Sequence, residues 1–339
     1  MRKLLNTLYV TIPNAYLSKD GETILVRVEQ ETRLRVPIHT LEGIVCVGVV
    51  SMSPPLMGFC AERNVGVSFL NEHGRFLARI QGPIHGNVLL RREQYRRADR
   101  GEDSAAIARS ILVAKIANCR TSLLRAGREH SSESIDRAST QLGQSLRLLA
   151  SSPSLDGLRG VEGDAAQTYF SVFDELILHQ KEEFFFHARS RRPPLDNVNA
   201  LLSFLYVLLA HDISSALETT GLDPTVGFLH RDRPGRASLA LDLMEEMRPM
   251  LADRLALTLI NRRQVSGNGF SRAESGGVTM NDATRKEVLT AWQLRKQEEI
   301  LHPFLNERIP FGLVPHVQAL LLARHLRGDL DAYPSFIWR

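Results

Sequence analysis

Cysteine and long apolar stretches are both scarce in this chain of 339 residues. The three cysteines, Cys46, Cys60 and Cys119, are widely spaced and form no CxxC pair, which argues against a disulfide framework and a zinc knuckle. No apolar run reaches the roughly 18 residues that a membrane span needs, and the longest is Ala200–Ala210. The N-terminus lacks the apolar core of a signal peptide. We therefore expect a cytoplasmic protein without a membrane partner.

Lysine is also rare, with six lysines against 36 arginines. The net charge is only +4, so the surface is not that of a histone. A GC-rich genome would explain the arginine bias, whereas the functional interpretation is phosphate recognition, because guanidinium groups bind phosphate oxygens in a bidentate manner. The arginines fall in short clusters, which would suit contacts to a nucleic-acid backbone at separated points.

The pattern of apolar residues changes along the chain. Before residue 85, short β-branched runs alternate with turn signals, which is typical of a small β unit. These runs are Thr7–Thr11, Thr23–Val28, Leu34–Ile38, Ile44–Val49, Gly66–Leu70 and Phe76–Ile80. From about Asn87 the spacing becomes helical. The predicted helices are Ala105–Arg125, Glu133–Leu149, Gly163–Ile177, Asn197–Ala216, Leu239–Asn261, Asn281–Gln297 and Leu313–Arg327.

These patterns predict an α+β multidomain protein. A small β-sandwich-like domain is expected at residues 1–85 and a larger all-α domain at residues 86–339. Loops rich in serine or glycine are expected at Ser152–Leu158 and Val265–Gly277.

Three segments of the helical region carry acidic or imidazole side chains. Glu162 lies in a Gly-Val-Glu-Gly string just before a predicted helix, and His230 follows an apolar stretch and precedes a basic turn. Asp242 and Glu245 are three residues apart, so on a helix they share one face. Together these side chains offer oxygen and nitrogen donors without a thiolate, a set that suits Mg²⁺ or Mn²⁺ more than structural zinc. Such a cation at an arginine-rich surface would suit phosphodiester chemistry.

Each segment also has a purely structural explanation. Glu162 would then be a solvated acid at a helix start, which the helix macrodipole favours. His230 would be a capping or packing residue. The two helix acids would be ion-paired with a nearby arginine such as Arg248 or Arg254.

Longer strings occur in a fixed order along almost the whole chain. They are Gly160–Ala166, Arg191–Phe204, Gly221–Pro224, Gly227–His230, Ser238–Glu246 and Leu259–Arg263. In their order and joint presence they resemble the CRISPR adaptation integrases, the larger of the two core spacer-acquisition proteins, also described as CRISPR-associated endonucleases. Near the end, Gln318-Ala319, Leu326–Leu330, Tyr333-Pro334 and Trp338 resemble the type I-C variety.

The resemblance implies a β domain that pairs two subunits and a helical catalytic domain. It implies a Mg²⁺ or Mn²⁺ site formed by Glu162, His230 and Glu245, with Asp242 as the second choice because family members often have Asp where this chain has Glu245. The implied reaction is transesterification, in which the 3′-hydroxyl of a captured DNA fragment attacks a phosphodiester at the repeat boundary of the CRISPR array. The implied partners are double-stranded and splayed DNA, a second copy of the chain and a small ferredoxin-like protein.

Two other functions compete with this one. The first is a metal-dependent nuclease that acts on branched DNA in repair. The second is a non-catalytic DNA-binding scaffold, whose acidic residues are only a salt-bridged helix face.

Arginines near His230 are candidates for DNA contact. Arg231, Arg233 and Arg236 lie in a short turn after it, so we expect at least one to face the phosphates beside the scissile bond. The alternative is that they pair only with Asp232 or other nearby acids. Further candidates for DNA contact are Arg191 and Arg192.

Overall fold

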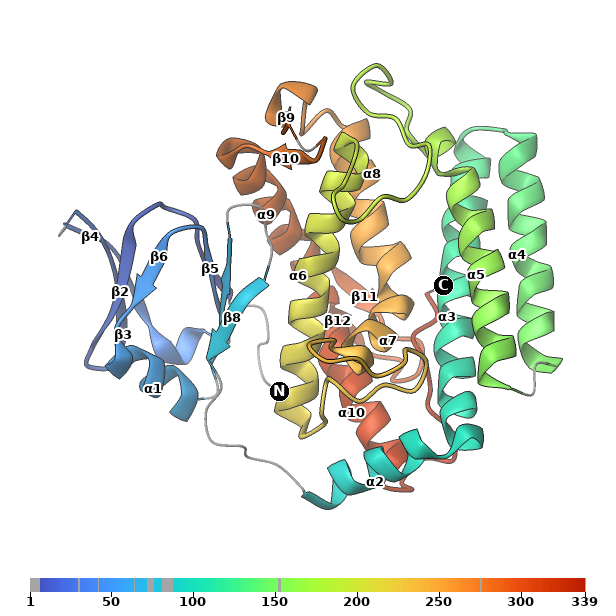
Figure 1. Cartoon of the computed structure of the whole chain (residues 1–339), viewed down its shortest axis with the longest axis horizontal. Helices are drawn as coiled ribbons and strands as arrows, with labels where there is room; N and C mark the ends of the chain where they lie inside the picture. Colours follow the sequence, from blue (N-terminus) through green and yellow to red (C-terminus); the bar gives the residue numbers. More distant parts are fainter. Residues whose placement is uncertain are drawn as a thin grey trace.

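The computed structural model describes residues 7–29, 31–41, 43–63, 65–71, 76–80, 88–151, 154–274 and 276–338. Two four-stranded sheets form the N-terminal part, and a larger helical part follows (Figure 1). One sheet has the order β4 (Glu31–Pro37), β3 (Thr23–Val28), β2 (Ala15–Asp20) and β6 (Val50–Met52). The other has the order β1 (Thr7–Val10), β5 (Gly43–Val47), β7 (Gly66–Leu70) and β8 (Phe76–Ile80).

Strand β5 is buried on both faces. Because successive side chains of a strand point to opposite faces, Ile44 and Cys46 enter the core shared by the two sheets, while Val45 and Val47 enter the core of the helical part. Strand β5 also pairs in parallel with both of its neighbours, β1 and β7, which fits a near-continuous apolar sequence. The second sheet therefore joins the β-rich part to the helices.

All six predicted strands are present, but the structure has two more in this part, β2 and β6. Strand β2 alternates buried Ala15 and Leu17 with exposed Tyr16, but its last two residues are a lysine and an aspartate. Because these residues are uncommon in strands, the sequence pattern did not predict β2. One short helix, α1 (Pro54–Glu62), capped by Ser53, lies between β6 and β7 in the sequence. The expected boundary between residues 85 and 86 falls within 81–87, outside the described residues, so the division into domains stays a prediction.

The helical part contains nine long helices in the described residues. They are α2 (Val88–Asp99), α3 (Gly101–Glu129), α4 (Glu133–Ser151), α5 (Leu155–Ser171), α6 (Asn197–Thr220), α7 (Ser238–Met247), α8 (Arg254–Asn261), α9 (Asp282–Gln297) and α10 (Val314–Leu326). The predicted start of α9 is confirmed, because the Asn281 side chain accepts a hydrogen bond from the backbone N–H of Thr284.

Helix α6 runs through the centre, with the sheets on one side and helices α3, α4 and α5 on the other (Figure 1). It connects to the β-rich part through His211, hydrogen-bonded to Ser68, and through Glu218, ion-paired with Arg79. By length and composition α6 could cross a membrane, but 56% of its most apolar window is buried inside the protein, as in a core helix.

Four expectations for the helical part are wrong. It is not all-α, because it contains two short hairpins, β9 (Phe270–Arg272) with β10 (Val278–Met280) and β11 (Glu299–Leu301) with β12 (Arg308–Pro310). Strand β9 therefore lies within the expected loop at residues 265–277. The expected helix Leu239–Asn261 is divided into α7, a π-helical segment (Arg248–Asp253) and α8. Helix α5 begins at Leu155, inside the expected loop at residues 152–158.

Candidate metal centre

Glu162 lies in the interior of α5 rather than before a helix. The helix begins earlier than its glycines suggest, because the Ser154 side chain accepts a hydrogen bond from the backbone N–H of Gly157 and caps it. A Cβ atom added at Gly160 or Gly163 would meet nothing within 4 Å, so neither glycine is required by packing. They leave open space on α5 at these two positions.

His230 is held by a loop that wraps around Asp242. The Asp242 carboxylate is fully buried and accepts hydrogen bonds from the backbone N–H groups of Phe228, Leu229 and His230 at 2.6, 2.9 and 2.9 Å. Its Oδ1 atom also lies 2.6 Å from Nδ1 of the His230 ring. These contacts compensate the charge of a buried carboxylate and fix the imidazole orientation.

The same loop is fixed from two further sides. Arg159 on α5 donates from Nε and Nη2 to the carbonyl oxygen of Leu229, at 2.9 and 2.7 Å. A Cβ atom at Gly227 would lie 2.8 Å from Asp242 Oδ2 and 2.9 Å from the carbonyl carbon of Ser238. Only glycine lets the loop approach α7 this closely.

Glu245 lies at the centre of a buried cluster of charges. Its Oε1 accepts a hydrogen bond from Arg248 at 2.6 Å, and its Oε2 lies 2.7 Å from Nζ of Lys115. The second contact lacks hydrogen-bond geometry, so Oε2 is a buried carboxylate oxygen held by charge alone. Burial opposes ionisation of Glu245, but the two cations outweigh it and hold its pKa well below the usual range.

Lys115 connects the two predicted carboxylate ligands. Its ammonium group forms an ion pair with Glu162 as well as with Glu245, and only 6% of the residue is exposed. Burial lowers the lysine pKa, but the charges of Glu245 and Glu162 outweigh burial, so the pKa is raised. Carboxylates of α5 and α7 thus converge on one cation supplied by α3.

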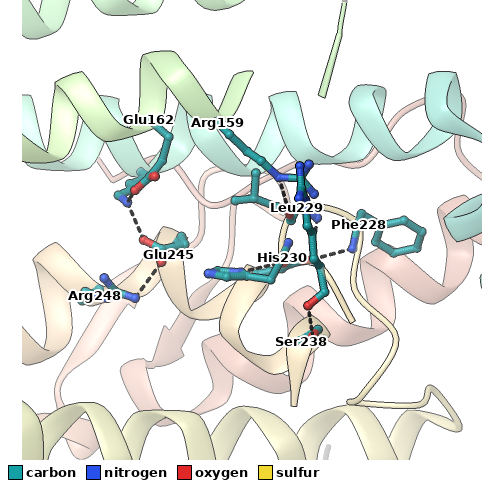
Figure 2. Close-up of polar contacts among 11 residues, drawn as sticks. Arg159, Glu162, Phe228, Leu229, His230, Ser238, Glu245 and Arg248 are labelled. Carbon is teal, nitrogen blue, oxygen red and sulfur yellow. Dashed lines mark hydrogen bonds and ion pairs between the residues drawn. The ribbon is translucent and has the colours of Figure 1, made fainter. Parts of the chain in front are cut away.

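The structure brings Glu162, Glu245 and His230 into one region (Figure 2). The His230 ring reaches toward Glu245 (Figure 2). Within the described residues, however, no three His, Cys, Asp or Glu side chains lie close enough to hold a metal ion, and the Lys115 ammonium stands between the two carboxylates.

The donor set fits a hard divalent cation. Two carboxylates and one imidazole nitrogen are suitable ligands for Mg²⁺ or Mn²⁺, and Glu245 Oε2, which has no hydrogen bond, already faces a positive charge, the Lys115 ammonium at 2.7 Å. Asp242 does not fit as a direct ligand, because both of its oxygens accept bonds from the His230 loop.

The predicted DNA-binding arginines are placed at the surface. Arg231 forms an ion pair with Asp156 on α5 at 3.2 Å. Arg233 is exposed and Arg236 partly so, and neither has an ion pair within the described parts of the chain. Arg191 and Arg192 are exposed in the segment before α6. The expected alternative of pairing with a neighbouring acid therefore holds for Arg231.

Sequence reasoning missed Lys115. The signal was present, because it is one of only six lysines and interrupts the apolar run from Ile111 to Ile116. A lysine on the buried stripe of a helix requires a charged partner. The identity of that partner could not be found in α3 itself.

Comparison with known proteins identifies relatives along the whole chain. The family described as CRISPR associated protein Cas1 matches residues 8–294. CRISPR-associated endonuclease Cas1 1 from Chlorobaculum tepidum is 53% identical over 343 residues, and Cas1 2 from Rhodospirillum rubrum is 52% identical over 347, each covering 100% of both chains.

Solved structures show the same fold at lower identity. A Cas1 protein from Thermotoga maritima has a TM-score of 0.82 at 23% identity and covers 95% of this chain and 97% of its own. A casposase bound to its integration product has a TM-score of 0.84 at 21% identity, covering 97% and 93%. The extent of the family match and the identity to the curated relatives place this chain in the Cas1 family of CRISPR-associated proteins.

Proposed function

We propose that this protein is a metal-dependent DNA endonuclease and integrase of CRISPR adaptation. The observation that carries the metal assignment is the convergence of the Glu162 and Glu245 carboxylates on one cation, beside an imidazole aligned by Asp242. Glu162, Glu245 and Nε2 of His230 would hold Mg²⁺ or Mn²⁺. When bound, the ion stabilises negative charge on the scissile phosphate and lowers the pKa of the attacking oxygen.

The chain's own residues prepare this site. Asp242 holds a proton on Nδ1 of His230, which leaves the lone pair of Nε2 available on the other side of the ring. Arg248 keeps the Glu245 carboxylate ionised and fixes its direction. Arg159 clamps the carbonyl oxygen of Leu229, so that the histidine loop cannot move away from α5.

The proposed reaction is attack by the 3′-hydroxyl of a captured DNA fragment on a phosphodiester at the repeat boundary. One phosphodiester bond forms as another breaks, so the step requires no ATP. Water in place of the hydroxyl would produce hydrolysis at the same site. The casposase neighbour is described as bound to an integration product, which supports transesterification on this fold.

Protein partners are part of the proposal. Structural neighbours include a Cas6–RT–Cas1–Cas2 complex, with a TM-score of 0.83 at 22% identity, whose matched chain is only 36% covered. We infer that this chain also assembles with a small ferredoxin-like protein. We further infer that two copies of this chain form a dimer through residues 1–85. Sedimentation of the full chain as a monomer at micromolar concentration would contradict the pairing.

Two finer assignments remain proposals. The strings near residues 318–338 support a type I-C system, and a cytoplasmic location is the second assignment. We also propose that Arg233 or Arg236 contacts DNA phosphates, since they lie three and six residues after His230 and are exposed or partly exposed. Either replacement by alanine should reduce the salt dependence of DNA binding by about one unit.

The test uses a splayed DNA duplex and a repeat-containing target with Mg²⁺, Mn²⁺ or EDTA. Glu162→Gln and Glu245→Gln should abolish strand transfer and nicking, because each removes a charged ligand. Asp164→Asn is the matched control, since Asp164 is an exposed carboxylate on the same helix as Glu162. Full activity in EDTA, or in both glutamine variants, would reject the metal assignment. Nicking without strand transfer, even with the partner protein, would favour a repair nuclease.

A further inference from the structure

Tyr206 on α6 contacts two residues of the π-helical segment that begins three residues after Glu245. The Tyr206 hydroxyl donates a hydrogen bond to Oδ1 of Asp253 at 2.5 Å. The centroid of its ring lies 4.7 Å from the guanidinium carbon of Arg248. All four side chains are buried. One tyrosine therefore lies against both the arginine that pairs with Glu245 and an acid that could compete for that arginine.

The π-helical form of the segment explains how one tyrosine contacts both of its ends. Arg248 and Asp253 are the first and last residues of the segment, which packs against α6. In an α-helix, residues five apart point about 140° away from each other around the axis. In a π-helix, hydrogen bonds join residues five apart, as the N–H of Arg254 is joined here to the carbonyl oxygen of Pro249, so such residues lie one turn apart. The wider turn thus brings both charged side chains to Tyr206.

The guanidinium group of Arg248 has few contacts that fix its direction. Its Nη2 donates to Oε1 of Glu245 at 2.6 Å (Figure 2), and Glu245 is its only ion-pair partner within the described residues. Its Nε is buried and has no hydrogen-bond partner. The ring of Tyr206 is a second support, through a cation–π contact that depends on the orientation of the ring. Glu245 and Tyr206 together therefore direct Arg248.

A second arginine contacts the same ring but is held elsewhere. The guanidinium carbon of Arg189 lies 5.1 Å from the Tyr206 ring centroid. Arg189 donates to Oδ1 of Asn199 and Oγ of Ser203 on α6, at 2.6 and 3.1 Å. These hydrogen bonds fix Arg189 against α6, so Arg248 is the guanidinium near Asp253 that has room to change its partner.

Asp253 is the acid with which Arg248 does not pair. Asp253 and Arg248 line one cavity together with Glu245, and Oδ2 of Asp253 is buried there without a hydrogen bond. The hydroxyl of Tyr169 also lines this cavity but makes no hydrogen bond. Opposite charges attract strongly in a buried environment, because water does not screen them. The hydrogen bond from Tyr206 compensates part of the Asp253 charge and so weakens its attraction for Arg248.

We propose that Tyr206 is a positioning residue for the metal centre. Its hydroxyl occupies Asp253 and its ring faces Arg248, so that Arg248 pairs with Glu245 and holds that carboxylate in the direction of the metal ion. The inference rests on the proposed function, because Glu245 is one of the proposed metal ligands. It adds a residue of α6 that touches neither the ion nor the DNA and acts through Arg248.

The experiment titrates the full chain with Mn²⁺ by calorimetry. Tyr206→Phe keeps the ring and removes the hydroxyl, so Oδ1 of Asp253 loses its partner and the carboxylate attracts Arg248. Glu245 then loses the contact that fixes its direction, and the affinity for Mn²⁺ should fall about tenfold, as is typical when the support of a metal ligand is lost.

A second substitution tests the mechanism. Tyr206→Phe combined with Asp253→Leu removes both ends of the hydrogen bond and the competing charge, and replacing both partners by apolar groups is often nearly neutral for stability. Arg248 should return to Glu245, and the affinity for Mn²⁺ should return close to the wild-type value. A tyrosine that only fills space would show no such rescue. If this double variant does not fold, Tyr206→Phe with Asp253→Asn removes the charge at nearly constant size and gives the same test.

Tyr333→Phe is the matched control. Tyr333 is a buried tyrosine whose hydroxyl also donates to a buried carboxylate, Oε1 of Glu246, at 2.7 Å. Glu246 keeps hydrogen bonds from Gln318 and from the N–H of Phe336 in this variant. Thermal unfolding should show that both phenylalanine variants lose stability, whereas only Tyr206→Phe should lose affinity for Mn²⁺.

The outcomes separate this inference from the proposed function. If the wild type binds Mn²⁺ and Tyr206→Phe binds it equally well, Tyr206 has no positioning role and the proposed metal centre stands. An equal loss of affinity in Tyr333→Phe would overturn the inference, since any loss of a buried tyrosine hydroxyl would then have this effect. Failure of the Asp253 substitutions to restore affinity would also overturn it. If the wild type binds no Mn²⁺, the proposed metal centre fails together with the inference.

Discussion

Nδ1 of His230 lies 2.6 Å from Oδ1 of Asp242, which is buried and accepts three backbone hydrogen bonds from the same loop. One carboxylate therefore sets both the path of the loop and the tautomer of its histidine. The neighbouring acid Glu245 does not hold the loop or the histidine ring and instead forms an ion pair with the ammonium group of Lys115. The two acids of α7 thus have different roles although they share one helical face.

Asp242→Asn should weaken divalent binding although Asp242 is not itself one of the proposed ligands. The amide group presents a donor where Asp242 accepts bonds only, so one or more N–H groups of the loop lose their partner, at a cost of about 1–3 kcal/mol. The His230 tautomer is no longer fixed, and loss of such a support typically reduces metal affinity about 10–100-fold. Mn²⁺ titration by calorimetry tests this expectation, and unchanged affinity would contradict it.

Lys115→Met should make the protein depend on a divalent ion for stability. Without the ammonium group the buried Glu245 carboxylate keeps only Arg248, and breaking a buried ion pair costs up to about 3–5 kcal/mol. In EDTA the variant should unfold at a lower temperature than the wild type. Mn²⁺ should raise the unfolding temperature of the variant by more than it raises that of the wild type. Lys181→Met, which removes an exposed ion pair with Asp174, is the control and should show no such recovery.

Gly227→Ala and Gly163→Ala should have opposite effects. At Gly227 the added carbon would lie 2.8 Å from Asp242 Oδ2 and 2.9 Å from the backbone of Ser238, so the histidine loop must move. At Gly163 it meets nothing within 4 Å inside a helix, where alanine is favoured by about 0.5–1 kcal/mol. Urea unfolding compares the two variants, and equal stability would show that the loop is not held as tightly as the contacts indicate.

Glu246→Gln should change how stability depends on pH. Burial raises the pKa of Glu246 to about 7, partly offset by hydrogen bonds from Phe336, Tyr333 and Gln318. A carboxyl with a raised pKa binds its proton more tightly when folded, so its contribution to stability falls as pH rises from about 4.5 to 7. The free energy of unfolding of the variant, minus that of the wild type, should therefore be larger at pH 8 than at pH 5, so the variant is relatively more stable at pH 8. Parallel curves for the two proteins would refute this.

Local sequence patterns predicted most elements of this fold. Alternating β-branched residues marked β3 and β7, and cap residues such as Asn281 marked a helix start, because backbone preference and capping act within a few residues. Regular spacing did not reveal the π-helical segment, since the residues of Leu239–Asn261 follow one continuous apolar pattern. The glycines around Glu162 likewise suggested a helix start, whereas capping by Ser154 begins α5 earlier.

By itself the sequence determined which residue types were available to bind a hard cation, and Glu162, His230 and Glu245 were predicted as its ligands from their chemistry and their strings. Only the tertiary structure decided their roles, because these depend on contacts between distant segments. The packing of α3 against α5 and α7 places Lys115 between two carboxylates, and the loop before α7 engages Asp242 rather than Glu245. The same packing brings Trp338 to Arg125 across more than 200 residues, a contact that no local pattern encodes.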